Sequence, residues 1–135
     1  MATQIYPDQG LGEWLKKMTQ FHSLSYRLFV NNVTPDKNTI LADLTEESTG
    51  SYSRVDVAPG DWTSYTVTAH VGTAFAPPIS FTPSGTTWTT YGYYVVDAST
   101  GTLLLAVCRF DSAPLSTPSG TGILITPKIS DFSKF

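Results

Sequence analysis

The first periodic stretch of the chain has the period of a helix. Leu11, Trp14, Leu15 and Met18 follow the i, i+3, i+4, i+7 spacing of one helical face, and charged residues lie between them. This pattern predicts an N-terminal arm, residues 1–22, that contains an amphipathic helix of about two to three turns. So short a helix is marginal in water by itself, so its apolar stripe must dock on another surface.

From Ser23 onward the apolar positions recur with a period of two. In "LSYRLFV", residues 24–30, alternate residues are apolar, which predicts the first strand. Further short strands are predicted at Val55 to Val57, "SYTVTAHV" (64–71), "ISF" (79–81), the two halves of residues 86–110, and "ILITPKI" (123–129). Turns rich in Gly, Pro and Asn separate them.

Seven or eight short strands with no helix between them predict an all-β protein, an antiparallel β-sandwich or jelly roll. No internal repeat and no linker interrupts the pattern. We therefore expect an arm with a short helix at residues 1–22 and a single β-sandwich domain at residues 23–135.

The stretch "TTWTTYGYYVVDASTGTLLLAVCRF", residues 86–110, predicts a hairpin that is apolar on both faces. A five-residue loop at 97–101 would place Val96 opposite Thr102, Tyr94 opposite Leu104 and Trp88 opposite Phe110. An antiparallel sheet usually has one solvated face, so two apolar faces imply a second cover. That cover is either the N-terminal helix or another subunit. The interface candidates are therefore Trp14, Leu15, Met18, Tyr91, Tyr93, Leu105 and Val107.

Composition and charge exclude some partners. Only 14% of residues are charged, the formal net charge is −3 and the isoelectric point is near 5.1. Without a basic surface, neither nucleic acid nor an anionic membrane is expected as a partner. The N-terminus lacks the basic and apolar regions of a signal peptide, and no apolar run reaches 18 residues, so we expect synthesis and folding in a cytoplasm.

Candidate chemistry is sparse along the chain. His22 and His70 are far apart, and Cys108, the single cysteine, is expected to be a small buried residue within a strand. We expect no metal, no cofactor and no catalytic residue. Two groups of carboxylates are assigned to turns: a solvated acidic loop with Asp43, Glu46 and Glu47, and turn caps at Asp97 and Asp111.

The aromatic residues allow two interpretations. They could form a carbohydrate platform, or they could be ordinary core and interface residues of a β-sandwich, which is the interpretation we favour. The residues concerned are Trp62, Tyr65, Trp88, Tyr91, Tyr93 and Tyr94.

A series of motifs between about residues 10 and 130 resembles a group of small tailed-bacteriophage proteins. The motifs are "YRLFVNNVTP", "LADLTEESTGSY", "GDW", "ISFTPSG", "YGYYVVDASTGTLLLAVCRFDSAP" and "ILITPKI". The matching positions, most of them with a structural role by our interpretation, are Asn31, Asn32, Thr34, Pro35, Thr45, Glu46, Gly50, Tyr52, Tyr91, Gly92, Tyr93, Val95, Asp97, Arg109 and Phe110.

The resemblance implies a component of the phage particle. Our first hypothesis is a capsid decoration, or cement, protein on the surface of the virion. It would form a homo-oligomer, expected to be a trimer, and bind the major capsid protein between capsomers. The alternative is a tail or fibre module that binds a host-surface glycan, and an enzyme such as a cell-wall hydrolase ranks third.

Overall fold

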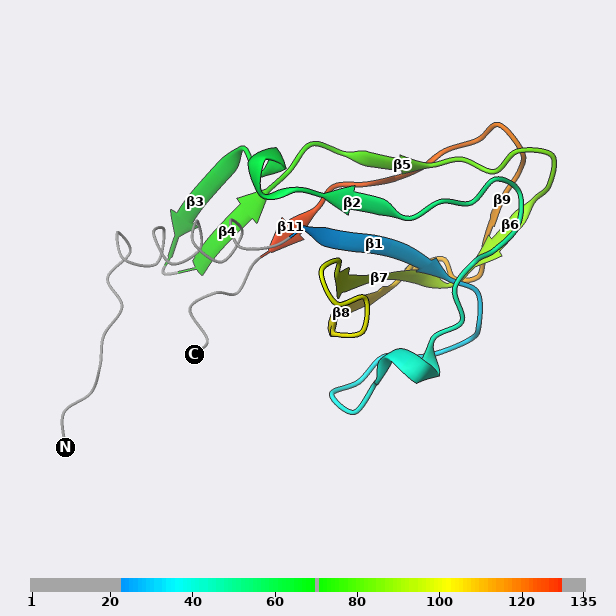
Figure 1. The fold of residues 1–135 in the computed structure, drawn as a ribbon, viewed down its shortest axis with the longest axis horizontal. Helices are drawn as coiled ribbons and strands as arrows, with labels where there is room; N and C mark the ends of the chain where they lie inside the picture. The colour runs from blue at the N-terminus through cyan, green and yellow to red at the C-terminus, as the bar shows by residue number, and fades with distance from the viewer. Residues whose placement is uncertain (1–22, 70, 130–135) are drawn as a thin grey trace. The chain divides into compact units, whose positions relative to one another are not determined.

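The computed structural model describes residues 23–69 and 71–129, and Figure 1 shows their fold. The regular elements of these residues are antiparallel strands and two single turns of 3-10 helix, η1 (Leu41–Asp43) and η2 (Pro59–Asp61), which confirms the all-β class. The predicted N-terminal helix, with Trp14, Leu15 and Met18, lies outside the described residues. So do His22 and His70.

The described chain divides into two compact units. One comprises residues 57–78 and 126–129, and the other comprises residues 23–56 and 79–125. Each unit is described separately below.

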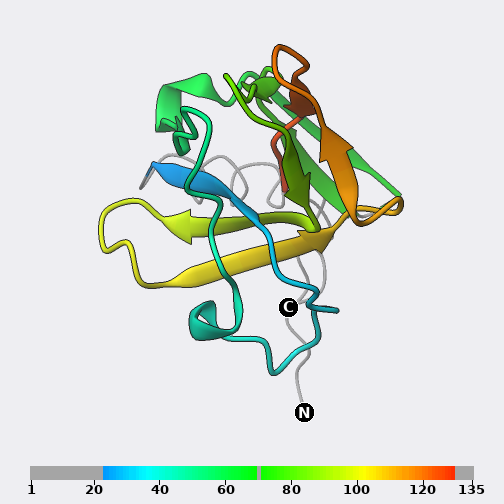
Figure 2. The ribbon, with the colours of Figure 1, turned by 90° about the vertical axis from the view of Figure 1, so that its right-hand side faces the viewer.

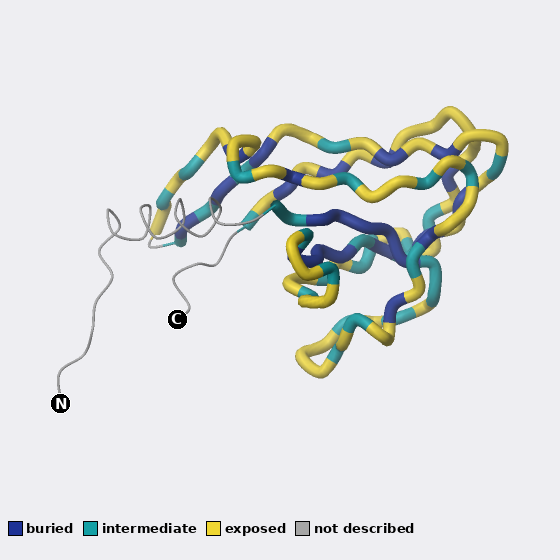
Figure 3. Tube along the Cα trace, viewed as in Figure 1, coloured by how far each residue is buried: buried dark blue, intermediate teal, exposed yellow. Residues whose placement is uncertain are grey.

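The larger unit contains a four-stranded sheet in the order β2-β1-β7-β8. Its strands are β1 (Leu24–Phe29), β2 (Val55–Val57), β7 (Gly92–Asp97) and β8 (Leu104–Arg109). The strand predicted from "LSYRLFV" is β1, and it pairs antiparallel with β7 so that Leu28 faces Tyr93. β1 and β7, the two central strands of this sheet, are almost entirely buried, as the dark tube in Figure 3 shows.

The predicted hairpin exists, but its register differs from the one expected. Val96 faces Leu104 and Tyr94 faces Val107, with a register shift between Val95 and Val96. The expected pairing of Tyr94 with Leu104 was therefore wrong. The first pair after the loop already differs by two residues, because Val96 faces Leu104 and not Thr102, and a β-bulge in β8 adds a third.

The first half of the predicted hairpin divides into two strands, β6 (Trp88–Thr90) and β7, which belong to different sheets. β6 ends before Tyr91 and pairs with β9 (Leu115–Thr117), so Trp88 faces Thr117 and not Phe110. β9 lies in a segment that the sequence predicted as a loop. The Trp88 indole Nε1 donates a hydrogen bond to the carbonyl oxygen of Thr49 (2.9 Å), a contact that holds β6 away from the line of β7.

Two groups of side chains form the interior of this unit. Phe29, Leu44, Tyr94 and Val96 pack on one face of the sheet. In the other group, Tyr52 stacks on Phe81 with ring centroids 6.1 Å apart and meets Trp88 edge-on at 5.8 Å. Phe81 belongs to β5 (Ile79–Phe81), which pairs with β10 (Ile123–Ile125).

The smaller unit contains a three-stranded sheet in the order β11-β4-β3. Its strands are β3 (Ser64–Thr68), β4 (Val71–Phe75) and β11 (Lys128–Ile129). The single strand predicted for residues 64–71 was wrong, because the chain reverses direction at Ala69, whose φ is 50°. The predicted last strand, 123–129, likewise divides into β10 and β11, with Pro127 between them.

Candidate functional site

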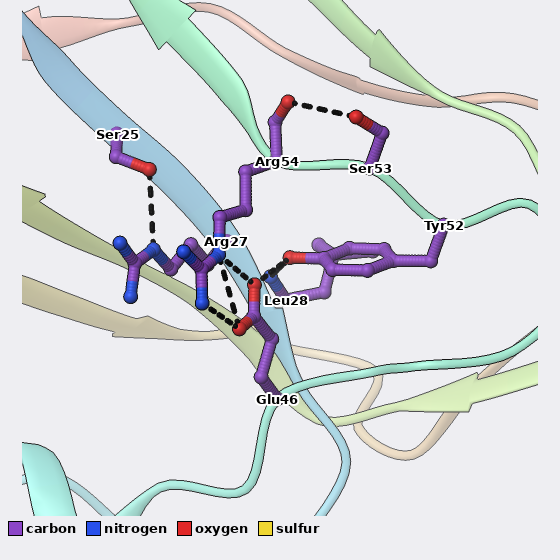
Figure 4. Close-up of polar contacts among 7 residues, drawn as sticks. All are labelled: Ser25, Arg27, Leu28, Glu46, Tyr52, Ser53 and Arg54. Carbon is purple, nitrogen blue, oxygen red and sulfur yellow. Dashed lines mark hydrogen bonds and ion pairs between the residues drawn. The ribbon is translucent and has the colours of Figure 1, made fainter. Parts of the chain in front are cut away.

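A carboxylate in the larger unit, that of Glu46, receives three hydrogen-bond donors. Arg54 binds it with two donors on one edge of the guanidinium, with Nη2 2.8 Å from Oε1 and Nε 2.9 Å from Oε2. The hydroxyl of Tyr52 donates to Oε2 at 2.8 Å. Figure 4 shows Glu46 between these two side chains. We call Glu46, Tyr52 and Arg54 the Glu46 cluster.

The position of the cluster follows from an interruption in strand pairing. Residues 45–47 pair with the end of β1, where Phe29 bridges Glu46 and the Glu47 N–H donates to the Leu28 carbonyl (3.1 Å). The chain then leaves β1 as a loop and returns as β2. Across the gap the Tyr52 hydroxyl accepts the hydrogen bond of the Leu28 N–H at 3.1 Å. Tyr52 therefore replaces a missing strand partner, and Arg54 closes the loop onto Glu46.

The electrostatics of the cluster favour an ionised Glu46. Burial alone would raise the pKa of its carboxyl, but the hydrogen bonds from Arg54 and Tyr52 outweigh burial and lower that pKa. Burial and the bond to Glu46 together raise the pKa of the Tyr52 phenol far above its usual value. A carboxylate held ionised by two donor groups is a poor proton acceptor, so the cluster is suited to holding the loop in place.

Arg27 lies beside this cluster and was not singled out by the sequence analysis. Its Nε donates to the Ser25 hydroxyl (3.1 Å), its side chain is buried, and its positive charge contributes to the lowered pKa of Glu46. Figure 4 shows Arg27 and Arg54 on the same side of β1. The sequence contains no signal for it, because Arg27 and Ser25 occupy the alternate positions of the strand where polar residues are expected.

Of the other predicted carboxylates, Asp43, Glu47 and Asp97 accept backbone N–H groups in turns. Glu47 is only 8% exposed and accepts the N–H groups of Ser48 and Thr49 at 2.9 Å, so the expectation of a solvated acidic loop was wrong for Glu46 and Glu47. Their hydrogen bonds repay the cost of burial, which composition cannot show. The predicted cap at Asp97 is confirmed, because its Oδ1 accepts the N–H of Ser99 at 2.9 Å.

Cys108 is exposed, so the expectation of a buried cysteine was wrong. β8 is an edge strand with one neighbour, and an apolar sequence on an edge strand does not ensure burial. Burial of Tyr93, together with the adjacent Cys108, raises the pKa of the Tyr93 phenol to about 12.

Among the residues that the structure describes, no group of three or more His, Cys, Asp or Glu side chains could hold a metal ion. Within the same residues no helix is long and apolar enough to cross a membrane.

The aromatic residues divide between interior and partly exposed positions. Trp62, Trp88 and Tyr94 are buried, in agreement with the core interpretation. Tyr91 packs against the Phe29 group, and its ring lies under Arg109, with the guanidinium carbon 5.4 Å from the ring centroid. Tyr93 is partly exposed.

The Tyr93 ring contacts two other aromatic rings, those of Tyr26 on β1 and of Phe110 just after β8. It stacks on Tyr26 at 5.9 Å and lies 6.3 Å from Phe110.

The interface candidates Leu105 and Val107 lie together on β8. Val107 is partly buried against the Phe29 group, whereas Leu105 is 48% exposed and Leu103, just before the strand, is 53% exposed. A groove of about 370 Å³ runs beside the strand and is lined by Pro35, Asp36, Thr39 and Leu104 to Val107. We call this the edge groove. Figure 2 shows β8, in gold, at the outer edge of its sheet.

A second groove, of about 470 Å³, lies in the same unit where β9 and β10 meet the segment after β8. It is rich in hydroxyl side chains, and we call it the hydroxyl groove. Its lining is Phe110, Asp111, Ser112, Leu115, Ser116, Thr117, Thr121, Gly122, Ile123 and Leu124.

Comparison with known proteins identifies no relative: no family model, no curated protein and no solved structure matches this chain.

Proposed function

We propose that the chain is a capsid decoration, or cement, protein of a tailed bacteriophage. It would be built as a β-sandwich or jelly roll, bind the major capsid protein between capsomers, and stabilise the shell by adding buried contact area. The resemblance of the sequence motifs supports the setting in a phage particle. The role needs no catalytic step, because binding free energy alone stabilises the assembled state.

One structural observation supports an assembly role most directly: the exposed apolar residues on the edge strand β8. Leu103 and Leu105 are about half exposed, and Ala106 and Cys108 are exposed beside them. Contiguous apolar residues on a free strand edge mark a surface where another chain can dock.

The copy number of the chain in purified phage particles tests the proposal. A decoration protein is expected at a stoichiometry comparable with that of the major capsid protein, measured by quantitative mass spectrometry of washed particles. A handful of copies per particle would indicate the tail instead. Absence from washed particles would overturn the assignment to the virion.

A tail or fibre module that binds a host glycan is the second candidate, and the hydroxyl groove favours it. Hydroxyl groups, one carboxylate (Asp111) and one aromatic ring (Phe110) line this groove, and such groups can hydrogen-bond and stack on a sugar. Glycan-array binding that is lost in Asp111→Asn would support this candidate. Unchanged binding in that variant, or no binding by the wild-type chain, would exclude the groove as a glycan site.

A further inference from the structure

We propose that β8 pairs antiparallel with β8 of a second copy, about a twofold axis, and so joins two four-stranded sheets into one. The inference deepens the proposed function and rests on it for the use of the contact in a particle. The pairing itself is a property of the purified chain and can be measured separately.

The two edges of the sheet differ in how they are protected. β2, at one edge, has three residues and carries the exposed Asp56 at its centre. β8, at the other edge, has six residues and no charge before Arg109. Soluble proteins usually shorten or charge an exposed edge to prevent pairing with another chain. β2 is protected by its short length and its charge, whereas β8 is long and uncharged before Arg109 and has the β-bulge opposite Val95 and Val96 as its protection.

The edge groove has the right position for an additional strand. Four consecutive residues of β8, Leu104 to Val107, line it. These four residues include the β-bulge of β8, so the groove follows the strand across the bulge. Pro35, Asp36 and Thr39 of the same chain also line the groove.

Charge favours a second copy in the antiparallel direction. From Leu103 to Cys108 no residue is charged, so a pairing centred near Ala106 brings only neutral residues opposite one another. Each Arg109 then lies opposite Leu103 of the other copy, and the two arginines are roughly 20 Å apart. That separation exceeds the Debye length of about 8 Å at physiological salt. A parallel pairing in register would place the arginines side by side.

The ends of the antiparallel pairing are also complementary in charge. The Asp97 N–H donates to the Leu103 carbonyl (3.0 Å), so Asp97 lies on the strand next to Leu103. Arg109 of one copy therefore approaches the end of the other sheet that carries Asp97, at a distance of roughly two strand spacings, about 10 Å. The attraction is weak at that distance, but it occurs at both ends of the pairing.

The area of the contact sets its strength. A stable interface buries about 800 Å² on each partner, whereas one six-residue strand is only about 20 Å long. The pairing should therefore be weak for two free molecules, with a dissociation constant on the order of 10 µM. Many copies held on one shell would make the same contact effective through their high local concentration.

Sedimentation velocity of the full chain, from about 1 to about 200 µM, brackets that dissociation constant. The mass should rise from the monomer's 14.7 kDa towards twice that value. Leu105→Lys places a charge on the edge and should remain a monomer over the whole range. Leu124→Lys is the matched control, because Leu124 is a more exposed leucine (73%) on β10, in a different sheet from β8, and it should dimerise like the wild type.

Three outcomes would overturn the proposal: a wild-type chain that stays monomeric, a wild-type trimer, or dimerisation of Leu105→Lys equal to that of the wild type. A twofold contact through one strand joins only two copies, so a trimer would need another surface. Circular dichroism establishes that both variants are folded. If Leu105→Lys is misfolded, hydrogen exchange on the wild type decides. The amides of residues 104–108 should gain protection as concentration rises, and protection independent of concentration would refute the pairing.

The same variants separate this inference from the proposed function. A chain that dimerises through β8 but is absent from particles would leave the pairing intact and remove the decoration role. A chain found on particles at high copy number that never dimerises would support the decoration role and refute the pairing.

Discussion

Three hydrogen-bond donors converge on the Glu46 carboxylate, two from Arg54 and one from Tyr52. These bonds exist only in the folded chain, so the pKa of Glu46 is lower in the folded state than in the unfolded state. A carboxyl whose pKa is lowered by folding stabilises the protein above its unfolded pKa, and that stability is lost as the pH falls through the folded pKa.

Glu46→Gln should therefore change the acid sensitivity of the fold. As the pH is lowered from about 5 towards the folded pKa, the free energy of unfolding should fall less steeply in the variant than in the wild type, because one linked proton is removed. Urea titrations at several pH values measure both slopes. Equal slopes for the two proteins would contradict the hydrogen-bonded, ionised Glu46 described here.

Gly92 is required for close packing between strands. A Cβ at this position would overlap the carbonyl oxygen of Cys108 and lie 2.6 Å from the ring of Phe29. Gly92→Ala should lower the free energy of unfolding by about 3 kcal/mol, since backbone and a buried ring cannot both move away. Gly60→Ala is the control, because nothing lies within 4 Å of its added Cβ, and chemical denaturation should find it within about 0.5 kcal/mol of the wild type.

At the scale of elements, β1 depends on a side chain to complete its hydrogen bonding. The Tyr52 hydroxyl accepts from the Leu28 N–H and donates to Glu46, while its ring packs between Phe81 and Trp88. The ring and the hydroxyl therefore have separate roles, which one substitution can distinguish.

Tyr52→Phe keeps the ring and removes the hydroxyl. It leaves the Leu28 N–H without its partner, so the free energy of unfolding should fall by about 1–3 kcal/mol. Thermal and urea denaturation measure the loss. Tyr91→Phe is the matched control, because the Tyr91 ring packs on the Phe29 group and its hydroxyl makes no hydrogen bond among the described residues. A loss of equal size in both variants would refute the role of the Tyr52 hydroxyl.

At the scale of the whole molecule, the open question is what the N-terminal stripe of Leu11, Trp14, Leu15 and Met18 docks on. We expect deletion of residues 1–21 to lower the melting temperature. Each large apolar side chain contributes about 1.5–3 kcal/mol when fully buried, and a short helix has no stability of its own. Differential scanning calorimetry measures the change.

The same truncated protein tests the alternative role as an adaptor. An unchanged melting temperature with lost binding to particles would mean that the stripe contacts another protein. Unchanged melting together with unchanged binding would contradict both roles.

Local patterns in the sequence predicted the all-β class and the places of several strands. β1, β2 and β5 lie where alternation and turn residues predicted them, because both signals act within a few neighbouring residues. The sequence also predicted the Asp97 cap, which is a local hydrogen bond to Ser99. The motif containing Glu46 and Tyr52 was noted, but not the cluster that joins them to Arg54.

Tertiary structure alone decided which strands pair and which side chains are exposed. The break before Gly92 and the strand β9 depend on contacts between distant residues, such as Trp88 with Thr49. Glu47 is buried and Cys108 exposed, against their chemical types. Long-range pairing placed Glu47 beside β1, where its N–H donates to the Leu28 carbonyl, and it placed Cys108 on the last strand of a sheet. A residue's exposure depends on its neighbours in space, and local sequence does not contain them.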